Sequence, residues 1–106
     1  RPQPLTHYVI VRADLPRGIL AVQLVHAAGE SSPGDLPTHT FAVALAARDE
    51  SHLELVERKL LEHQIPHRAI REPDAPWCNA LMAIGIVPVV DRSIVKPVTG
   101  SLALLK

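Results

Sequence analysis

Two polar side chains that could do chemistry lie on the otherwise small or aliphatic segment 18–28. Gln23 can donate and accept hydrogen bonds through its amide, and His26 can act as a base because an imidazole titrates near neutral pH. The two residues are three apart, which places them on one face of a helix. This pair predicts a binding or reaction site. The alternative for His26 is a buried structural histidine that ties the helix to its neighbours by hydrogen bonds.

Acidic residues that could assist this pair follow expected strands. Asp14 comes shortly after an apolar strand, and it could hold Arg12, cap the turn before the helix, or contact a substrate. Glu72 and Asp74 lie in a proline-flanked turn beside strand ends, where catalytic carboxylates are often found. The alternative for this turn is a solvated surface loop without a function.

Other kinds of chemistry have little support in the sequence. The six histidines do not form metal-ligand spacings, since Pro66 breaks the helix that would align His63 with His67. There is no G-x-S-x-G elbow, and no glycine-rich phosphate loop follows the first strand. We therefore expect neither a metal nor a cofactor.

The composition is that of one globular domain over residues 1–106. Its hydrophobic content is 47% and its aromatic content 3%, so the core must be aliphatic. Eleven basic and eleven acidic residues give zero formal charge, which weakens any case for tight non-specific nucleic-acid binding. A single cysteine fits a reducing compartment, and no apolar run is long enough to span a bilayer. We expect a cytoplasmic protein with no membrane contact.

Apolar periodicity and chain-breaking residues predict the order of elements. Strands are expected at 8–11, 40–45, 67–70 and 80–87, and the last is apolar enough to be central. Helices are expected at 16–28, ended by Gly29, at 49–63, and as a short segment within 89–95. Residues 102–105 are expected to form an apolar tail. The order βαβαββα predicts an α/β protein, a three-layer α/β/α sandwich around a four-stranded mixed sheet.

Three parts of the chain resemble the type 2 (archaeal and eukaryotic) peptidyl-tRNA hydrolase family. Residues 9–15, VIVRADL, are similar to the family pattern V-V-R-x-D-L, and residues 18–28, GILAVQLVHAA, are similar to G-K-x-A-A-Q-x-x-H-A-A. Residues 84–88, IGIVP, and 98–105, VTGSLALL, are similar to L-G-I-G-P and V-T-G-H-L-K-L-L. The match follows the same order over nearly the whole chain, and the helix and the V-T-G segment are its most specific parts.

The resemblance implies hydrolysis of the ester that joins a peptide, or an N-blocked amino acid, to the 3′ end of tRNA. Gln23 would orient the ester or the attacking water, and Glu72 or Asp74 would act as the base with help from His26. The acceptor end of tRNA would be the partner. The residues expected to contact this substrate are Arg12, Asp14, Arg71, Lys96 and Thr99.

The chain departs from the family pattern at the catalytic lysine, whose position is occupied by Ile19. An aliphatic side chain can neither hold a phosphate nor polarise an ester carbonyl. The chain therefore resembles a divergent branch that lacks this lysine, in which hydrolysis is expected to be slow or aimed at another substrate. The alternative is a non-catalytic module on the same scaffold that binds RNA, a protein partner, or a second copy of itself as a homodimer.

Overall fold

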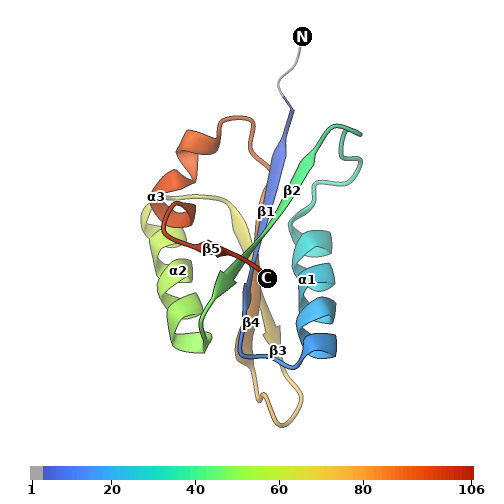
Figure 1. Ribbon diagram of the computed structural model, residues 1–106, viewed down its shortest axis with the longest axis vertical. Helices are drawn as coiled ribbons and strands as arrows, with labels where there is room; N and C mark the ends of the chain where they lie inside the picture. Colours follow the sequence, from blue (N-terminus) through green and yellow to red (C-terminus); the bar gives the residue numbers. More distant parts are fainter. Residues whose placement is uncertain (1–3) are drawn as a thin grey trace.

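A computed structural model describes residues 4–106 as an α/β protein built around one mixed sheet (Figure 1). In chain order, its elements are β1 (Thr6–Arg12), α1 (Arg17–Ser31), β2 (Phe41–Ala47), α2 (Glu50–Glu62), β3 (His67–Glu72), β4 (Ala80–Ile86), the 3-10 helix η1 (Arg92–Ile94), α3 (Lys96–Thr99) and β5 (Ala103–Leu104). The α/β class and the mixed sheet predicted from the sequence are confirmed.

The strand order is β3-β4-β1-β2-β5. β1 and β2 are parallel, which requires a crossover connection, and α1 supplies it. The other three pairs are antiparallel, and β4 lies between β3 and β1 as its apolar sequence predicted. The expected count of four strands is wrong, because the tail forms β5 and pairs Leu104 with Leu45 at the open edge of β2. A two-residue strand is too short to leave a periodic pattern in the sequence.

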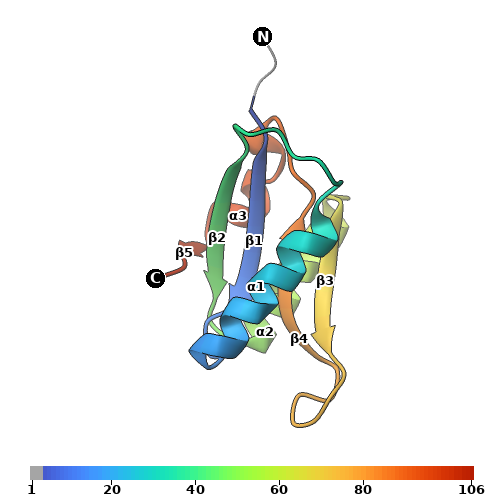
Figure 2. The same ribbon diagram turned by 90° about the vertical axis from the view of Figure 1, so that its right-hand side faces the viewer.

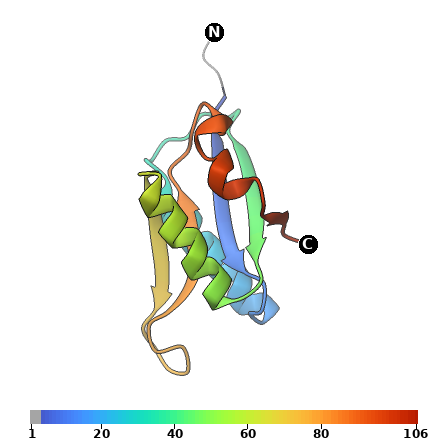
Figure 3. The same ribbon diagram turned by 90° about the vertical axis from the view of Figure 1, so that its left-hand side faces the viewer.

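Helices cover both faces of the sheet: α1 packs on one face (Figure 2), and α2 and α3 pack on the other (Figure 3). The alternation of side chains along β1 divides the core accordingly. Val9 and Val11 belong to the cluster beneath α1, whereas Tyr8 and Ile10 belong to the cluster beneath α2 and α3. The sheet therefore separates two apolar cores, and any surface site must lie on one side or the other.

The prediction that Gly29 ends the first helix is wrong, since α1 continues to Ser31. The Ser31 hydroxyl donates to the carbonyl oxygen of Ala27 at 2.6 Å and lies 2.7 Å from His7 Nε2. Because the serine donates to Ala27, it accepts the second hydrogen bond from the histidine. A Cβ on Gly85 would collide with Ser31 Oγ and the Ala27 carbonyl, so this glycine allows α1 to lie directly on β4. These contacts hold the last turn in place.

The short helix expected within 89–95 is also placed differently. Val89 pairs with Thr6 as an isolated bridge, with backbone hydrogen bonds of 2.8 and 3.0 Å. Helical structure begins only after Asp91, whose carboxylate accepts from the Ser93 N–H at 2.9 Å, and it continues into α3. Pairing with β1 outweighs the local helix preference of this apolar stretch. Among residues 4–106, no helix has the length and apolar character needed to cross a bilayer.

Candidate functional site

A hollow of about 340 Å³ lies between α1 and the β3–β4 turn, on the α1 face of the sheet. We call it the Gln23 hollow. Its walls are aliphatic on the helix side, with an aromatic ring and a carboxylate on the turn side. The residues that line it are Gly18, Ile19, Val22, Gln23, Glu72 and Trp77. It therefore brings together one amide and one acid that are far apart in the sequence.

The Gln23 side chain is almost fully covered, with 3% of the residue exposed. Among residues 4–106, no side-chain hydrogen bond involves its amide, yet no fully enclosed polar atom of that part of the chain lacks a partner. The amide must therefore keep a small contact with solvent, and the hollow provides it. A buried amide with unused donors and acceptors is costly unless water or a ligand satisfies it.

Glu72 reaches the hollow because of the alternation along β3. Ile70 packs in the cluster beneath α1, and Glu72, two residues later, lies on the same face. Arg71 lies between them and points to the α2 face, where its guanidinium is 3.3 Å from the Glu57 carboxylate. Arg71 was expected to help hold substrate phosphates beside Gln23, but the structure places it on the other side of the sheet.

The turn between β3 and β4 places Trp77 at the hollow. Its backbone N–H donates to the carbonyl of Asp74 at 3.0 Å, and the N–H of Asn79 donates to the Glu72 carbonyl at 2.6 Å. Cys78 and Asn79 both have positive φ angles, 47° and 71°, which is uncommon for residues other than glycine. Two consecutive left-handed residues thus close the turn immediately before β4 begins at Ala80.

Two of the four residues expected to be catalytic do not line the hollow. His26 is exposed, and the residues that α1 buries are Gln23, Ala27 and Ser31, a row with a spacing of four. The expectation that Gln23 and His26 act from one face is therefore wrong, because a step of three turns the side chain away from this row. The alternative of a buried structural histidine is wrong as well, since His26 is exposed. Asp74 is also exposed, and only its backbone N–H approaches Glu72 Oε2, at 3.4 Å.

Arg12 and Asp14 form a closed pair beside the hollow. Two guanidinium nitrogens of Arg12 donate to the two carboxylate oxygens of Asp14, at 2.8 and 2.9 Å. This hydrogen bonding lowers the pKa of Asp14 below its ordinary value and raises the pKa of Arg12. The guanidinium also lies 5.6 Å from the centre of the Trp77 ring. Arg12 thus supports Trp77, and its charge is already compensated rather than free for a phosphate.

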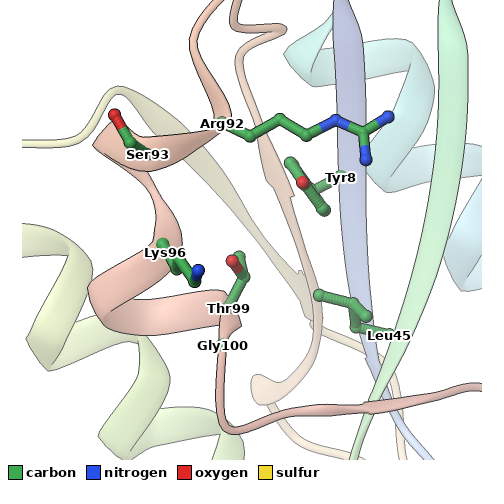
Figure 4. Close-up of a pocket in the computed structure, with 7 residues that line it drawn as sticks. All are labelled: Tyr8, Leu45, Arg92, Ser93, Lys96, Thr99 and Gly100. Atoms are coloured by element: carbon green, nitrogen blue, oxygen red, sulfur yellow. The ribbon is translucent and has the colours of Figure 1, made fainter.

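Lys96 and Thr99 belong to a different cavity, of about 370 Å³, on the α3 side of the sheet (Figure 4). We call it the Tyr8 pocket. The residues that line it are Tyr8, Leu45, Arg92, Ser93, Lys96, Thr99 and Gly100. The substrate-contacting residues expected from the sequence are therefore distributed over two faces and do not form one site.

Sequence reasoning missed Trp77 and Tyr8, although each is the single residue of its type in the chain. Trp77 stands three residues after Asp74, a candidate acid, so its position was a usable signal. Tyr8 is part of an apolar strand, and nothing local indicates a pocket above it. No local pattern sets Arg92 apart from the other basic residues of the chain.

Comparison with known proteins adds no assignment to this geometry. Within residues 4–106, no three His, Cys, Asp or Glu side chains are close enough to hold a metal ion. No protein-family model matches the chain, and no curated protein sequence matches it. The resemblance of the motifs to type 2 peptidyl-tRNA hydrolases therefore stays an expectation from the sequence.

Proposed function

We propose that the Gln23 hollow receives the ester end of a peptidyl-tRNA, or of an N-blocked aminoacyl-tRNA, and that the protein hydrolyses this ester. One observation carries the proposal. The Gln23 amide has no hydrogen-bond partner within residues 4–106, and it lines the same cavity as the Glu72 carboxylate. An amide and a carboxylate at one small cavity suit a reaction that needs an oriented carbonyl and an activated water.

In this reaction Glu72 would act first as a base and then as an acid, and Gln23 would act as a hydrogen-bond donor. Glu72 accepts a proton from a water molecule, and the water oxygen forms a bond to the ester carbonyl carbon. The amide N–H of Gln23 donates to the carbonyl oxygen as it gains negative charge. The bond to the ribose oxygen then breaks, and the proton held by Glu72 passes to that oxygen. The products are a free carboxylic acid and a tRNA with its terminal hydroxyl restored.

Trp77 gives the hollow a second property that suits this substrate. Trp77 is half-buried, and an indole face that lines a cavity can stack on nucleobases of any kind, which contributes about 1–3 kcal/mol per base. The terminal base of the acceptor end would stack on Trp77 while the ester reaches Gln23. Arg12, held by Asp14, would keep the ring in place from outside the cavity.

A non-catalytic binding function is the second candidate, and the aliphatic wall of the hollow favours it. Ile19 and Val22 line the cavity where a charged donor would assist ester cleavage. Such a wall suits an apolar or neutral group that is held without reaction. The two candidates differ in whether the bound ester is consumed.

The test follows ester loss from N-acetyl-aminoacyl-tRNA with the purified protein and its variants. Glu72→Gln removes the base and should lower kcat by about 100-fold, the low end of what general base catalysis contributes. Asp74→Asn is the matched control, since it removes the same charge two residues later, in the turn and outside the hollow, and should leave kcat unchanged. Equal losses in both variants would contradict a specific role for Glu72.

The amide is tested with Gln23→Met, which keeps the buried volume while removing the donor and acceptor. Loss of one neutral hydrogen bond should lower kcat by about tenfold, with thermal stability close to that of the parent. Saturable binding of the substrate without ester loss above the buffer rate would select the non-catalytic candidate. Neither binding nor ester loss would contradict both candidates.

A further inference from the structure

The Tyr8 pocket lies across the sheet from the Gln23 hollow, and the proposed hydrolysis does not use it. At about 370 Å³ it falls in the size range of cavities that hold small molecules. It opens beside α3, with the side chains of Lys96 and Thr99 at one wall and Leu45 opposite (Figure 4). The polar groups of this pocket point to the kind of ligand that would fill it.

The pocket contains two cations and no lining carboxylate. None of the ion pairs formed within residues 4–106 involves Arg92 or Lys96. Arg92 is nevertheless held in place, because its Nε donates to Thr6 Oγ1 at 3.0 Å and its guanidinium lies 5.5 Å from the centre of the Phe41 ring. Its two terminal nitrogens thus remain as donors on a side chain that is already positioned.

Two of the hydroxyls at the pocket already donate hydrogen bonds within the protein. The Ser93 hydroxyl donates to Asp91 at 2.7 Å, and the Thr99 hydroxyl donates to the Val95 carbonyl at 3.2 Å. Their hydrogens are therefore engaged within the protein. The nearest acid in sequence, Asp91, is occupied by Ser93 and does not line the pocket.

Tyr8 provides an independent sign that a ligand belongs here. The residue is only 8% exposed, yet no side-chain hydrogen bond within residues 4–106 involves its hydroxyl. No fully enclosed polar atom in that part of the chain is left without a partner, so the hydroxyl must open onto the pocket that Tyr8 lines. A buried tyrosine normally satisfies its O–H, and because no side-chain hydrogen bond within residues 4–106 does so here, a bound group or water can.

We propose that the Tyr8 pocket binds a small organic anion that carries a phosphate or carboxylate group on a compact apolar body. The anionic group takes hydrogen bonds from Arg92, Lys96 and the Tyr8 hydroxyl. The apolar body lies against Leu45 and the tyrosine ring. Because the chain has zero formal charge, its overall electrostatic field does not attract an anion. The two cations of the pocket supply the attraction.

The two cavities can be observed separately, because the only tyrosine lines one and the only tryptophan lines the other. The full chain is labelled with 3-fluorotyrosine and 5-fluorotryptophan and titrated with phenyl phosphate while the fluorine NMR spectrum is recorded. We expect a saturable shift of the Tyr8 signal at up to millimolar concentrations, with the Trp77 signal unchanged. Phenol has only the ring of phenyl phosphate, and inorganic phosphate has only its anionic group. Each should bind at least about tenfold more weakly than phenyl phosphate.

Two substitutions test the donors. Lys96→Gln should raise the dissociation constant of phenyl phosphate by about tenfold, and Arg58→Gln, which removes an exposed cation of α2 outside the pocket, should leave it unchanged. Tyr8→Phe, followed by calorimetry because it removes the label, should weaken binding by a few-fold without loss of the fold.

Several outcomes would overturn the proposal. They are the absence of a saturable Tyr8 shift, an equal effect of Lys96→Gln and Arg58→Gln, and equal shifts of both fluorine signals. If inorganic phosphate bound as tightly as phenyl phosphate, the apolar body would contribute nothing to binding, and this part of the proposal would be wrong. A Lys96-dependent Tyr8 shift with a tRNA acceptor-stem hairpin, but not with phenyl phosphate, would instead assign the pocket to a nucleic-acid surface.

Discussion

The Gln23 hollow and the Tyr8 pocket each lie near an arginine that rests on an aromatic ring, yet the two arginines serve different purposes. Arg12 lies over Trp77 and is closed off by both carboxylate oxygens of Asp14. Arg92 lies over Phe41, and no ion pair within residues 4–106 includes it. The aromatic contact therefore positions an arginine, whereas the presence or absence of a carboxylate decides whether its charge is available to a ligand.

The chemistry of the two cavities is accordingly complementary. The Gln23 hollow has an acid and no lining cation, and the Tyr8 pocket has two cations and no lining acid. One suits proton removal from water beside a neutral ester, and the other suits the binding of an anion. Because the sheet lies between them, changes to one cavity should leave the other intact, and this independence can be tested.

The largest effect is expected at Gly85, where α1 meets the sheet. Gly85→Ala places a methyl group against Ser31 Oγ and the Ala27 carbonyl, and it should lower the free energy of unfolding by about 3 kcal/mol. Urea denaturation measures this change. In folded protein, the fluorine signal of Trp77 should move while that of Tyr8 stays in place, because α1 covers only one face.

The matched control is Gly29→Ala, at a helical position where an added methyl meets nothing within 4 Å. It should stabilise the protein by about 0.5–1 kcal/mol through the better helix propensity of alanine. A Gly85 variant as stable as the parent would contradict the close approach of α1 to β4.

The next prediction tests whether the absence of a cation in the Gln23 hollow limits the rate of ester hydrolysis. Ile19→Lys places a charged donor in the hollow, and kcat/KM for N-acetyl-aminoacyl-tRNA should rise by about tenfold, equivalent to about 1.4 kcal/mol. Val25→Lys adds the same charge to an exposed position of the same helix, where the residue is 71% exposed. An equal gain in both variants would reduce the effect to general attraction of tRNA.

A smaller effect is expected when the carboxylate partner of Arg12 is removed. Asp14→Asn leaves Arg12 with the Leu81 carbonyl at 3.3 Å and with Glu50 at 3.9 Å. Because the Asp14 side chain is 40% exposed, the loss of stability should be only about 1 kcal/mol. Trp77 fluorescence should change, and phenyl phosphate binding at Tyr8 should not. A change at Tyr8 alone would contradict the separation of the two cavities.

The smallest effect is a dependence of stability on pH that comes from His7. Burial lowers the pKa of His7, so the unfolded chain takes up a proton at mildly acidic pH before the native chain does. The free energy of unfolding therefore decreases as the pH falls from about 7 toward 5, because protonation of His7 favours the unfolded chain. His7→Gln keeps a donor near Ser31 and should flatten the stability profile in that range, as measured by urea denaturation at each pH. His39→Gln, in an exposed loop, should retain the parent profile.

Most of the secondary structure could be predicted from the sequence because the signals are local. The helix expected at 49–63 is found as α2, and Asp49 caps its start because its carboxylate accepts from the His52 N–H at 2.9 Å. The short β-branched run around Val9 and the apolar run of β4 were recognisable strands for the same reason. The errors lie where distant contacts outweigh local preference. Gly29 stays helical because the contacts of the buried Ser31 hold the last turn of α1.

The candidate site was less accessible to prediction, because it depends on which way neighbouring side chains face. Glu72 and Arg71 are adjacent in sequence, yet one lines the Gln23 hollow and the other pairs with Glu57 across the sheet. The acid that shares a cavity with Gln23 could be narrowed to two residues from the sequence. Choosing between them required the path of the β3–β4 turn.

The α/β class, the helix that carries Gln23 and the turn that carries Trp77 follow from local patterns, since periodicity and turn residues act over a few positions. Glu72 was expected in that turn, but it is the last residue of β3. The placement of Lys96 and Thr99 in a separate pocket with Tyr8 follows from the fold alone. Successive side chains of a strand point to opposite faces of the sheet, so residues that were expected to form one site are divided between two.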